Sequence, residues 1–212
     1  MNHFVQWLKD RMLEPLPGYT AQKRMSKSLY RPQPDEAPPN AKESAVLILL
    51  FEEAGALNVL LIMRTADGGA HSGQIAFPGG KKEPEDPGYP DTALREANEE
   101  LSLDPQQVQV IGSISPLYIP VSNFIVHPVV AYADQLPDLE KSEFEVAEIF
   151  QIPLSTLFDS KQDTVINITL PLKGKIDITA YIINESVIVW GATAMILSEL
   201  ESLWDEFHGR QL

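Results

Sequence analysis

The chain has 212 residues, no cysteine and a formal net charge of -14 at pH 7. This length fits one domain with extensions, and the lack of cysteine excludes disulfides, thiolate metal sites and cysteine nucleophiles. The acidic charge argues against binding of nucleic acid through its phosphates.

In chain order, the first predicted element is an amphipathic helix over residues 2–14, with Phe4, Trp7 and Leu8 on one stripe. It lacks the basic-then-apolar order of a signal peptide. The Pro-rich stretch 31–39 can form neither a helix nor an inner strand. We therefore expect an N-terminal helix and Pro-rich connector over 1–40, and a main domain over 41–212.

The main domain alternates apolar runs with turn residues. These patterns predict strands near 44–51, 58–64, 74–77, 107–115, 124–132, 145–150, 163–170, 175–183 and 187–190. They also predict helices near 92–102, 153–158 and 191–208, with Asp91 capping the first of these just after Pro90. The longest apolar run, 45–51, is too short to span a bilayer. We expect a soluble cytoplasmic protein that does not bind membranes, with an α/β (α+β) mixed sheet and helices on both faces.

Three carboxylates share one face of the helix predicted over 92–102. Glu96, Glu99 and Glu100 stand at i, i+3 and i+4. Like charges at this spacing destabilise an isolated helix, and a divalent cation between them would account for the arrangement. Arg95 lies four residues before Glu99 and can pair with it. A solvated acidic face is the alternative for such a run taken alone.

Two glycines, Gly79 and Gly80, precede the loop that leads into this helix. Glycine permits close backbone approach, and it leaves carbonyl groups free to face a cation or amides free to face a phosphate. The glycines and the carboxylates together favour metal-assisted phosphate chemistry over a solvated face.

Residues 80–103 resemble the Nudix box of nucleoside-diphosphate-linked-moiety hydrolases. That signature reads Gly, five residues, Glu, seven residues, then Arg-Glu-apolar-x-Glu-Glu-x-Gly-apolar. The chain matches it from Gly80 and again from Arg95 to Leu101. It departs in three places: Asp86 replaces Glu, eight residues separate it from Arg95, and Ser102 replaces the last Gly.

The stretch just upstream, 60–80, is similar to the motif of the coenzyme A pyrophosphatase branch of Nudix proteins. The matching residues are Leu60, Leu61, Arg64, Gly73, Phe77, Pro78, Gly79 and Gly80, with His71 and Gln74 also typical of the branch. The segments 145–157 and 187–197 are similar to the closing strands and helix of that branch. The resemblance covers roughly 44–205, and its two motifs follow each other end to end.

This resemblance implies a Nudix-type α/β/α sandwich that hydrolyses a diphosphate bridge with water. It implies Mg²⁺ or Mn²⁺ bound by the Gly80 carbonyl, Glu96, Glu99 and Glu100. It implies catalytic roles for Arg95, Glu99 and a later carboxylate, Glu145, with Glu143 and Glu140 as alternatives. The implied substrate-binding residues are Arg64, His71, Gln74, Phe77, Gly79 and Lys81. His127 is a further candidate for phosphate contact, and a structural role for it stays open.

The implied substrate is coenzyme A or its thioesters, cleaved to 3′,5′-ADP and 4′-phosphopantetheine. Gly69 stands where the branch has an arginine, which could recognise the 3′-phosphate bidentately. The glycine keeps one alternative open, a diphosphatase for ADP-ribose or another nucleotide diphosphate. A separate alternative is a non-catalytic nucleotide-binding module. The partner is in each case a small molecule, and the sequence leaves a homodimer open.

Overall fold

The computed structural model describes residues 2–27, 32–65, 73–168 and 174–209, with side chains described outside 165–177. The strands are β1 (Lys42–Glu53), β2 (Ala56–Arg64), β3 (Ile75–Ala76), β4 (Gly79–Lys81), β5 (Gln109–Ser113), β6 (Leu117–Ile119), β7 (Phe124–Ala133), β8 (Val146–Pro153), β9 (Lys161–Ile168), β10 (Gly174–Ile182) and β11 (Ile188–Val189). The helices are α1 (His3–Arg11), α2 (Tyr19–Gln22), α3 (Tyr89–Leu101), α4 (Leu154–Asp159) and α5 (Gly191–Phe207). Short 3-10 turns are η1 (Lys23–Met25), η2 (Pro34–Glu36) and η3 (Pro105–Gln107).

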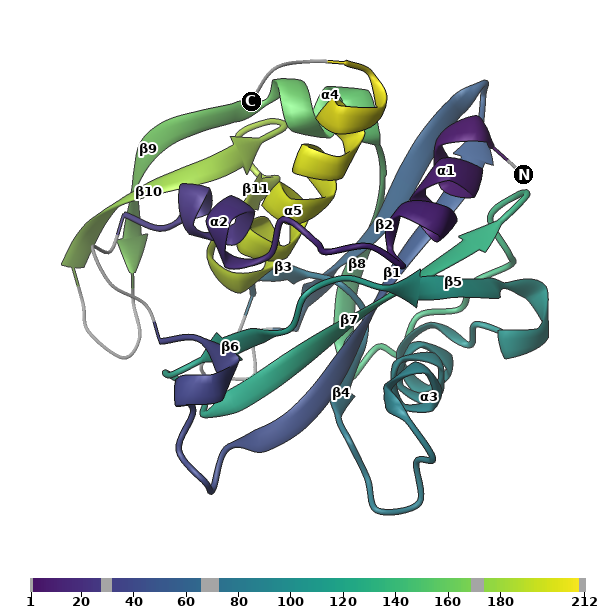
Figure 1. Cartoon of the computed structure of the whole chain (residues 1–212), viewed down its shortest axis with the longest axis horizontal. Coiled ribbons are helices and arrows are strands. Elements are labelled where there is room, and N and C mark those ends of the chain that lie inside the picture. The colour runs from purple at the N-terminus through teal and green to yellow at the C-terminus, as the bar shows by residue number, and fades with distance from the viewer. Residues whose placement is uncertain (1, 28–31, 66–72, 169–173, 210–212) are drawn as a thin grey trace.

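A mixed sheet forms the centre of the molecule (Figure 1). Its main order is β3-β2-β1-β7-β5, with β4 paired to β1, β6 to β7 and β8 to β2. β1 and β2 pair as an antiparallel hairpin, whereas β1 and β7 run parallel. A strand between two neighbours with both faces covered needs a continuous apolar run, and the middle of β1 supplies one.

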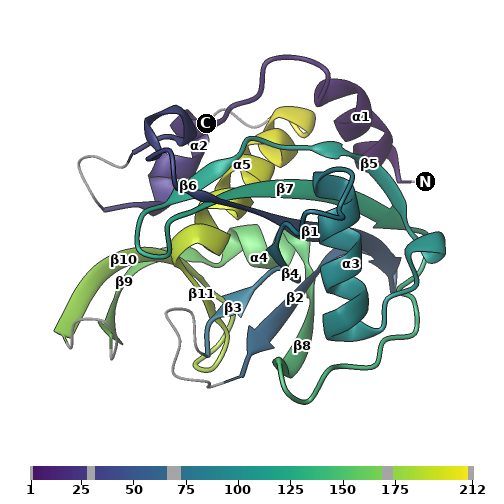
Figure 2. The ribbon, with the colours of Figure 1, turned by 90° about the horizontal axis from the view of Figure 1, so that it is seen from below.

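Helices cover both faces of this sheet. On one face α3 buries Ala97 and Leu101 against alternate β1 residues, such as Leu47. On the other face Ile48 packs in a second core with α1, α4 and α5, to which α5 contributes Leu200. Figure 2 shows α3 lying across β1 and β2, apart from the other helices. The predicted layering of a mixed sheet between helices is confirmed.

The N-terminal segment packs against α5 and the core. α1 buries Phe4 and Leu8 there. The buried carboxylate of Glu199 in α5 accepts hydrogen bonds from the Gly18 amide (3.0 Å) and from the Gln22 side-chain amide (2.9 Å). The division at residue 40 stays a prediction, and the first part of the chain contributes apolar residues to a core shared with the second.

The start of α3 differs from the prediction. The N-cap residue is Gly88, Pro90 lies in the first turn, and Asp91 is inside the helix rather than capping it. Proline is favoured in a first turn because its φ is already helical. Amides in the first turn have no intrahelical acceptor, so the N–H that proline lacks is not needed there. The helix ends at Leu101, and the C-cap residue Ser102 has φ of +54°, a left-handed conformation that glycine adopts more readily. This serine replaces the last glycine of the Nudix signature.

Within the described ranges, no helix has the length and apolar character needed to cross a membrane.

Candidate active site

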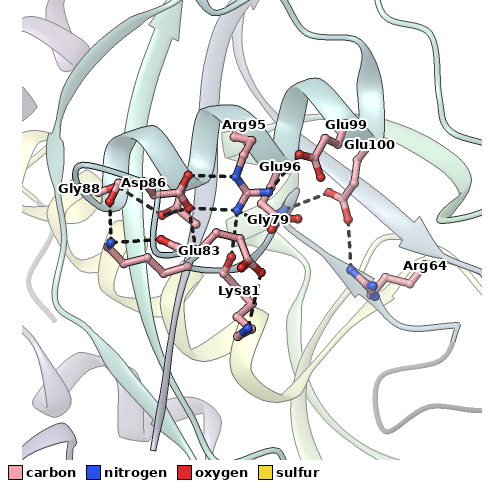
Figure 3. A network of polar contacts seen from close by, with 12 residues as sticks. Arg64, Gly79, Lys81, Glu83, Asp86, Gly88, Arg95, Glu96, Glu99 and Glu100 are labelled. Carbon is pink, nitrogen blue, oxygen red and sulfur yellow. Dashed lines mark hydrogen bonds and ion pairs between the residues drawn. The ribbon is translucent and has the colours of Figure 1, made fainter.

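Arg95 is the centre of a network at the start of α3 (Figure 3). Its guanidinium donates to both oxygens of Asp86 (3.0 and 3.1 Å), to Glu96 (2.9 Å) and to Glu99 (3.1 Å). It also donates to the Lys81 carbonyl in β4 (2.9 Å). The predicted pair of Arg95 with Glu99 is present. Arg95 therefore fixes two of the three helix carboxylates relative to β4 and the loop.

Asp86 anchors the loop between β4 and α3. Besides the Arg95 contacts, its carboxylate accepts from the Glu83 amide (2.9 Å) and from the Thr92 hydroxyl (2.9 Å). The hydrogen bonds from Arg95, opposed by burial and assisted by these two donors, hold the pKa of Asp86 well below its usual range. Through these contacts Asp86 connects the loop to the first turns of α3.

We expect Asp86→Asn to lower the free energy of unfolding by about 2 kcal/mol at pH 7, because an amide cannot accept from all of these donors. A carboxyl whose folded pKa is depressed stabilises the fold above its unfolded pKa of about 4. That stability is lost as pH falls through the folded pKa. The difference in the free energy of unfolding between Asp86→Asn and wild type should therefore become smaller below pH about 4. Urea unfolding at several pH values measures it.

The control for this variant is Asp91→Asn, an exposed change on the same helix. It should alter stability by less than about 0.5 kcal/mol. Equal stability of Asp86→Asn and wild type at pH 7 would contradict the role of Asp86 as an anchor.

The three helix carboxylates share a face but differ in burial. The Glu99 side chain is 55% exposed, Glu96 is 15% exposed and Glu100 is 1% exposed. Glu100 accepts from the Gly79 amide (3.0 Å) and pairs with Arg64 Nη1 (3.2 Å). Burial raises the pKa of Glu100 to about 7 and also raises the pKa of Glu96. Both carboxylates are thus held in a place where added positive charge would stabilise the ionised form.

The residues predicted to hold a metal fit one chemically. Gly80 lies in β4 opposite Ala45, and a side chain at Gly80 would overlap the Glu96 carboxylate. Carboxylate and carbonyl oxygens are the ligands that Mg²⁺ and Mn²⁺ prefer. In the part of the chain that the structure describes, no three acidic or histidine side chains already converge as a metal cluster. Arg95 and Arg64 neutralise the carboxylates instead.

Glu145 differs from the two alternative later carboxylates. It is the last residue of the turn before β8, and its carbonyl accepts from the Thr65 amide (3.0 Å). After burial and the nearer charges, its negative charge is among the causes that raise the pKa of Glu100 and Glu96. Glu143 is 77% exposed and pairs with Lys141.

Among the predicted substrate-binding residues, Arg64 and Lys81 lie at the site. Arg64 is one-third exposed at the end of β2, and its pairing with Glu100 is a contact that sequence spacing did not reveal. Lys81 is 56% exposed and lies near Glu83 (3.5 Å). The backbone carbonyl of Gln74 accepts from the Arg64 amide (3.1 Å), so the first and second halves of the upstream motif are hydrogen-bonded to each other.

Phe77 is not at the surface. It is 2% exposed and belongs to the core on the face opposite α3, so the prediction that it contacts substrate is not supported. An apolar ring packs where it escapes water, and the buried ring of Phe77 anchors the segment that leads into Gly79 at the start of β4. His71 and Gly69 lie outside the described residues.

A second cluster beside the start of α3 involves His127 of β7. Its Nε2 lies 2.6 Å from the carboxylate of Glu43, and its ring stacks on Tyr89 with centroids 3.5 Å apart. The Tyr89 hydroxyl also donates to Glu43 (3.3 Å). These contacts give His127 a structural setting. Its partners are distant in sequence, so no local pattern indicated them.

The fold and site together define a class of protein: a mixed sheet between helices, with a glycine-rich strand, a loop and a helix that carries Arg95 and three carboxylates. The NUDIX domain family matches residues 41–165, more than half of the chain. The chain therefore belongs to the Nudix family.

Relatives and solved structures agree with this assignment. Proteins named uncharacterized Nudix hydrolase NudL are similar to the chain. The protein from Yersinia enterocolitica is 35% identical over 173 residues, covering 81% of this chain and 86% of that protein. The protein from Citrobacter koseri is 36% identical over 172 residues, covering 81% and 88%. The Nudix hydrolase RenU of M. smegmatis has the same fold, with a TM-score of 0.54 at 17% identity over 85% of this chain and 94% of that one. The prediction of a Nudix enzyme, a pyrophosphohydrolase, is confirmed by the family match and the NudL relatives.

Proposed function

We propose that this protein hydrolyses the diphosphate bridge of coenzyme A or its thioesters to 3′,5′-ADP and 4′-phosphopantetheine. The observation that carries the proposal is the ion pair between Arg64 and Glu100. It joins the motif typical of the coenzyme A branch, which supplies Arg64, to the Nudix box, which supplies Glu100. The two sequence motifs therefore contribute to one site.

Within this proposal Glu96, Glu99, Glu100 and the Gly80 carbonyl would hold Mg²⁺ or Mn²⁺. Such a cation, when bound, neutralises a diphosphate and lowers the pKa of bound water. Positioning of the carboxylates and of the substrate would be done by side chains of the protein, chiefly Arg95 and Arg64.

Arg95 keeps Glu96 and Glu99 in place through its direct contacts. Arg64 offers a guanidinium beside the buried Glu100, suited to a phosphate oxygen because of its planar donor geometry. In this proposal Glu145 would accept the proton of the attacking water, because its backbone carbonyl is bonded to the amide of Thr65, the residue next to Arg64.

One observation favours a second candidate, hydrolysis of ADP-ribose or another nucleotide diphosphate. Gly69 occupies the place of the branch's arginine, which leaves the 3′-phosphate of coenzyme A without that partner. A non-catalytic module is disfavoured, because all three helix carboxylates are present. The proposed partner is a small molecule rather than nucleic acid or membrane. A cytoplasmic location and a homodimer remain predictions.

The deciding experiment incubates the protein with coenzyme A, acetyl-coenzyme A, ADP-ribose, NADH and nucleoside triphosphates, with Mg²⁺ and with Mn²⁺, and separates the products by chromatography. We expect 3′,5′-ADP from the two coenzyme A compounds, and none after removal of the metal with EDTA. Faster turnover of ADP-ribose would favour the second candidate. No product from any compound at high enzyme concentration would refute both.

A further inference from the structure

One aromatic side chain at the edge of the site is exposed to an unusual degree. Phe144 is 91% exposed, whereas every other phenylalanine of the chain is buried or half-buried. Among the described residues, Phe144 stands apart from the ring pairs, which gather chiefly around α1 and α5. The ring therefore leaves its faces free for a ligand.

The backbone beneath this ring is held firmly. Phe144 lies in a turn in which the amides of Glu145 and Val146 both donate to the Ser142 carbonyl (3.1 and 2.8 Å). The Phe144 carbonyl accepts from the Thr65 hydroxyl (2.8 Å). These hydrogen bonds fix the backbone from which the exposed ring of Phe144 projects.

The elements that hold the turn also carry the site. Thr65 follows Arg64 directly, and the Ser142 amide donates to the backbone carbonyl of Glu100 (2.8 Å). Arg64 and Glu100 are the two residues of the ion pair that joins the motifs. Phe144 is thus fixed by short backbone connections to both sides of the proposed diphosphate site.

We propose that Phe144 is the stacking platform for the base of the nucleotide substrate, an inference that rests on the proposed function and names how the site binds the base. A nucleotide presents a flat π-face on one side of its phosphates, and aromatic rings bind such faces with little dependence on the identity of the base.

Binding measurements with two probes separate the base from the phosphates. Wild type, Phe144→Ala and Phe144→Trp are titrated with ADP and with inorganic pyrophosphate, each with Mg²⁺, by calorimetry and fluorescence. In Phe144→Ala we expect ADP affinity to fall by about tenfold and pyrophosphate affinity to stay at the wild-type value. Phe144→Trp should keep ADP affinity, and its added emission should be quenched by ADP but not by pyrophosphate.

The matched control is Leu13→Ala, because Leu13 is 87% exposed and follows α1, which packs on the sheet face opposite α3. This control should bind both probes like wild type. Equal ADP affinity in Phe144→Ala and wild type would overturn the inference, and so would equal losses for ADP and pyrophosphate, which mark a general loosening of the site.

Hydrolysis assays keep this inference separate from the proposed function. For a base-containing substrate, Phe144→Ala should raise KM by about tenfold and leave kcat unchanged. An active wild type with an unaltered KM in Phe144→Ala would overturn only the role of Phe144. If wild type hydrolyses no substrate but Phe144→Ala still binds ADP more weakly than wild type, the proposed function is overturned and the stacking role of Phe144 is supported.

Discussion

Replacing Glu99 by Gln should lower kcat by more than about 100-fold, because loss of a group that merely supports a metal ligand already costs about 10- to 100-fold. The fold should survive. Glu99 is 55% exposed, and its pair with Arg95 is a surface ion pair, worth at most about 1 kcal/mol. Steady-state kinetics with Mg²⁺ and urea unfolding, made on the same preparation, measure the two effects separately.

A matched control for this variant exists in α5. Glu206 is 44% exposed and forms an ion pair with Arg11 (2.8 Å), so Glu206→Gln removes a comparable contact away from the site. We expect full activity in that control. If Glu99→Gln hydrolysed its substrate at the wild-type rate, the assignment of Glu99 as a metal ligand would be wrong.

Changing Gly79 or Gly80 to alanine should affect different properties: stability in the first variant and activity in the second. A Cβ at Gly79 would lie 2.6 Å from the Cα of Val46, on a backbone with φ of +149°. Backbone atoms cannot move aside cheaply, so we expect a loss of about 3 kcal/mol in the free energy of unfolding. The three atoms nearest to a Cβ at Gly80 all belong to the carboxylate group of Glu96, a side-chain end that can shift more cheaply than backbone. That variant should fold, and its kcat should fall by about 10- to 100-fold because the carboxylate is displaced.

The control for both glycine variants is Gly55→Ala. Gly55 has φ of +78° and open space around its Cα, so this change tests the backbone conformation without overlap and should cost about 1 kcal/mol. Thermal and urea unfolding rank the three variants. Full activity in Gly80→Ala would show that catalysis does not depend on the position of the Glu96 carboxylate.

The parts of this fold that follow from local patterns were predictable. Alternating and continuous apolar runs correctly indicated β1 and β2, and the spacing of Arg95 and Glu99 indicated their pairing. The short strand β6 was not predicted, because Pro116 and Pro120 flank it and made the segment look like a connection. Its three residues pair only as an addition to β7.

Contacts between distant residues were the part that the sequence could not provide. Glu100 looked like one of three equivalent carboxylates on a helix face, since helical spacing gives direction but not depth. Its burial depends on β4 and on Arg64, 36 positions away. Phe77 is the opposite case: its place in a motif suggested contact with substrate, whereas its ring is only 2% exposed and lies in the core.

The contacts of Asp86 explain two departures from the Nudix signature together. An aspartate is one methylene shorter than the glutamate of that pattern, and the loop before Arg95 is one residue longer. Its carboxylate nevertheless reaches the guanidinium at 3.0 and 3.1 Å. A shorter acid and a longer loop can therefore change as a compensating pair. Pattern searches that demand a fixed interval would overlook chains of this kind, while a search for the carboxylate–guanidinium clamp in three dimensions would find them.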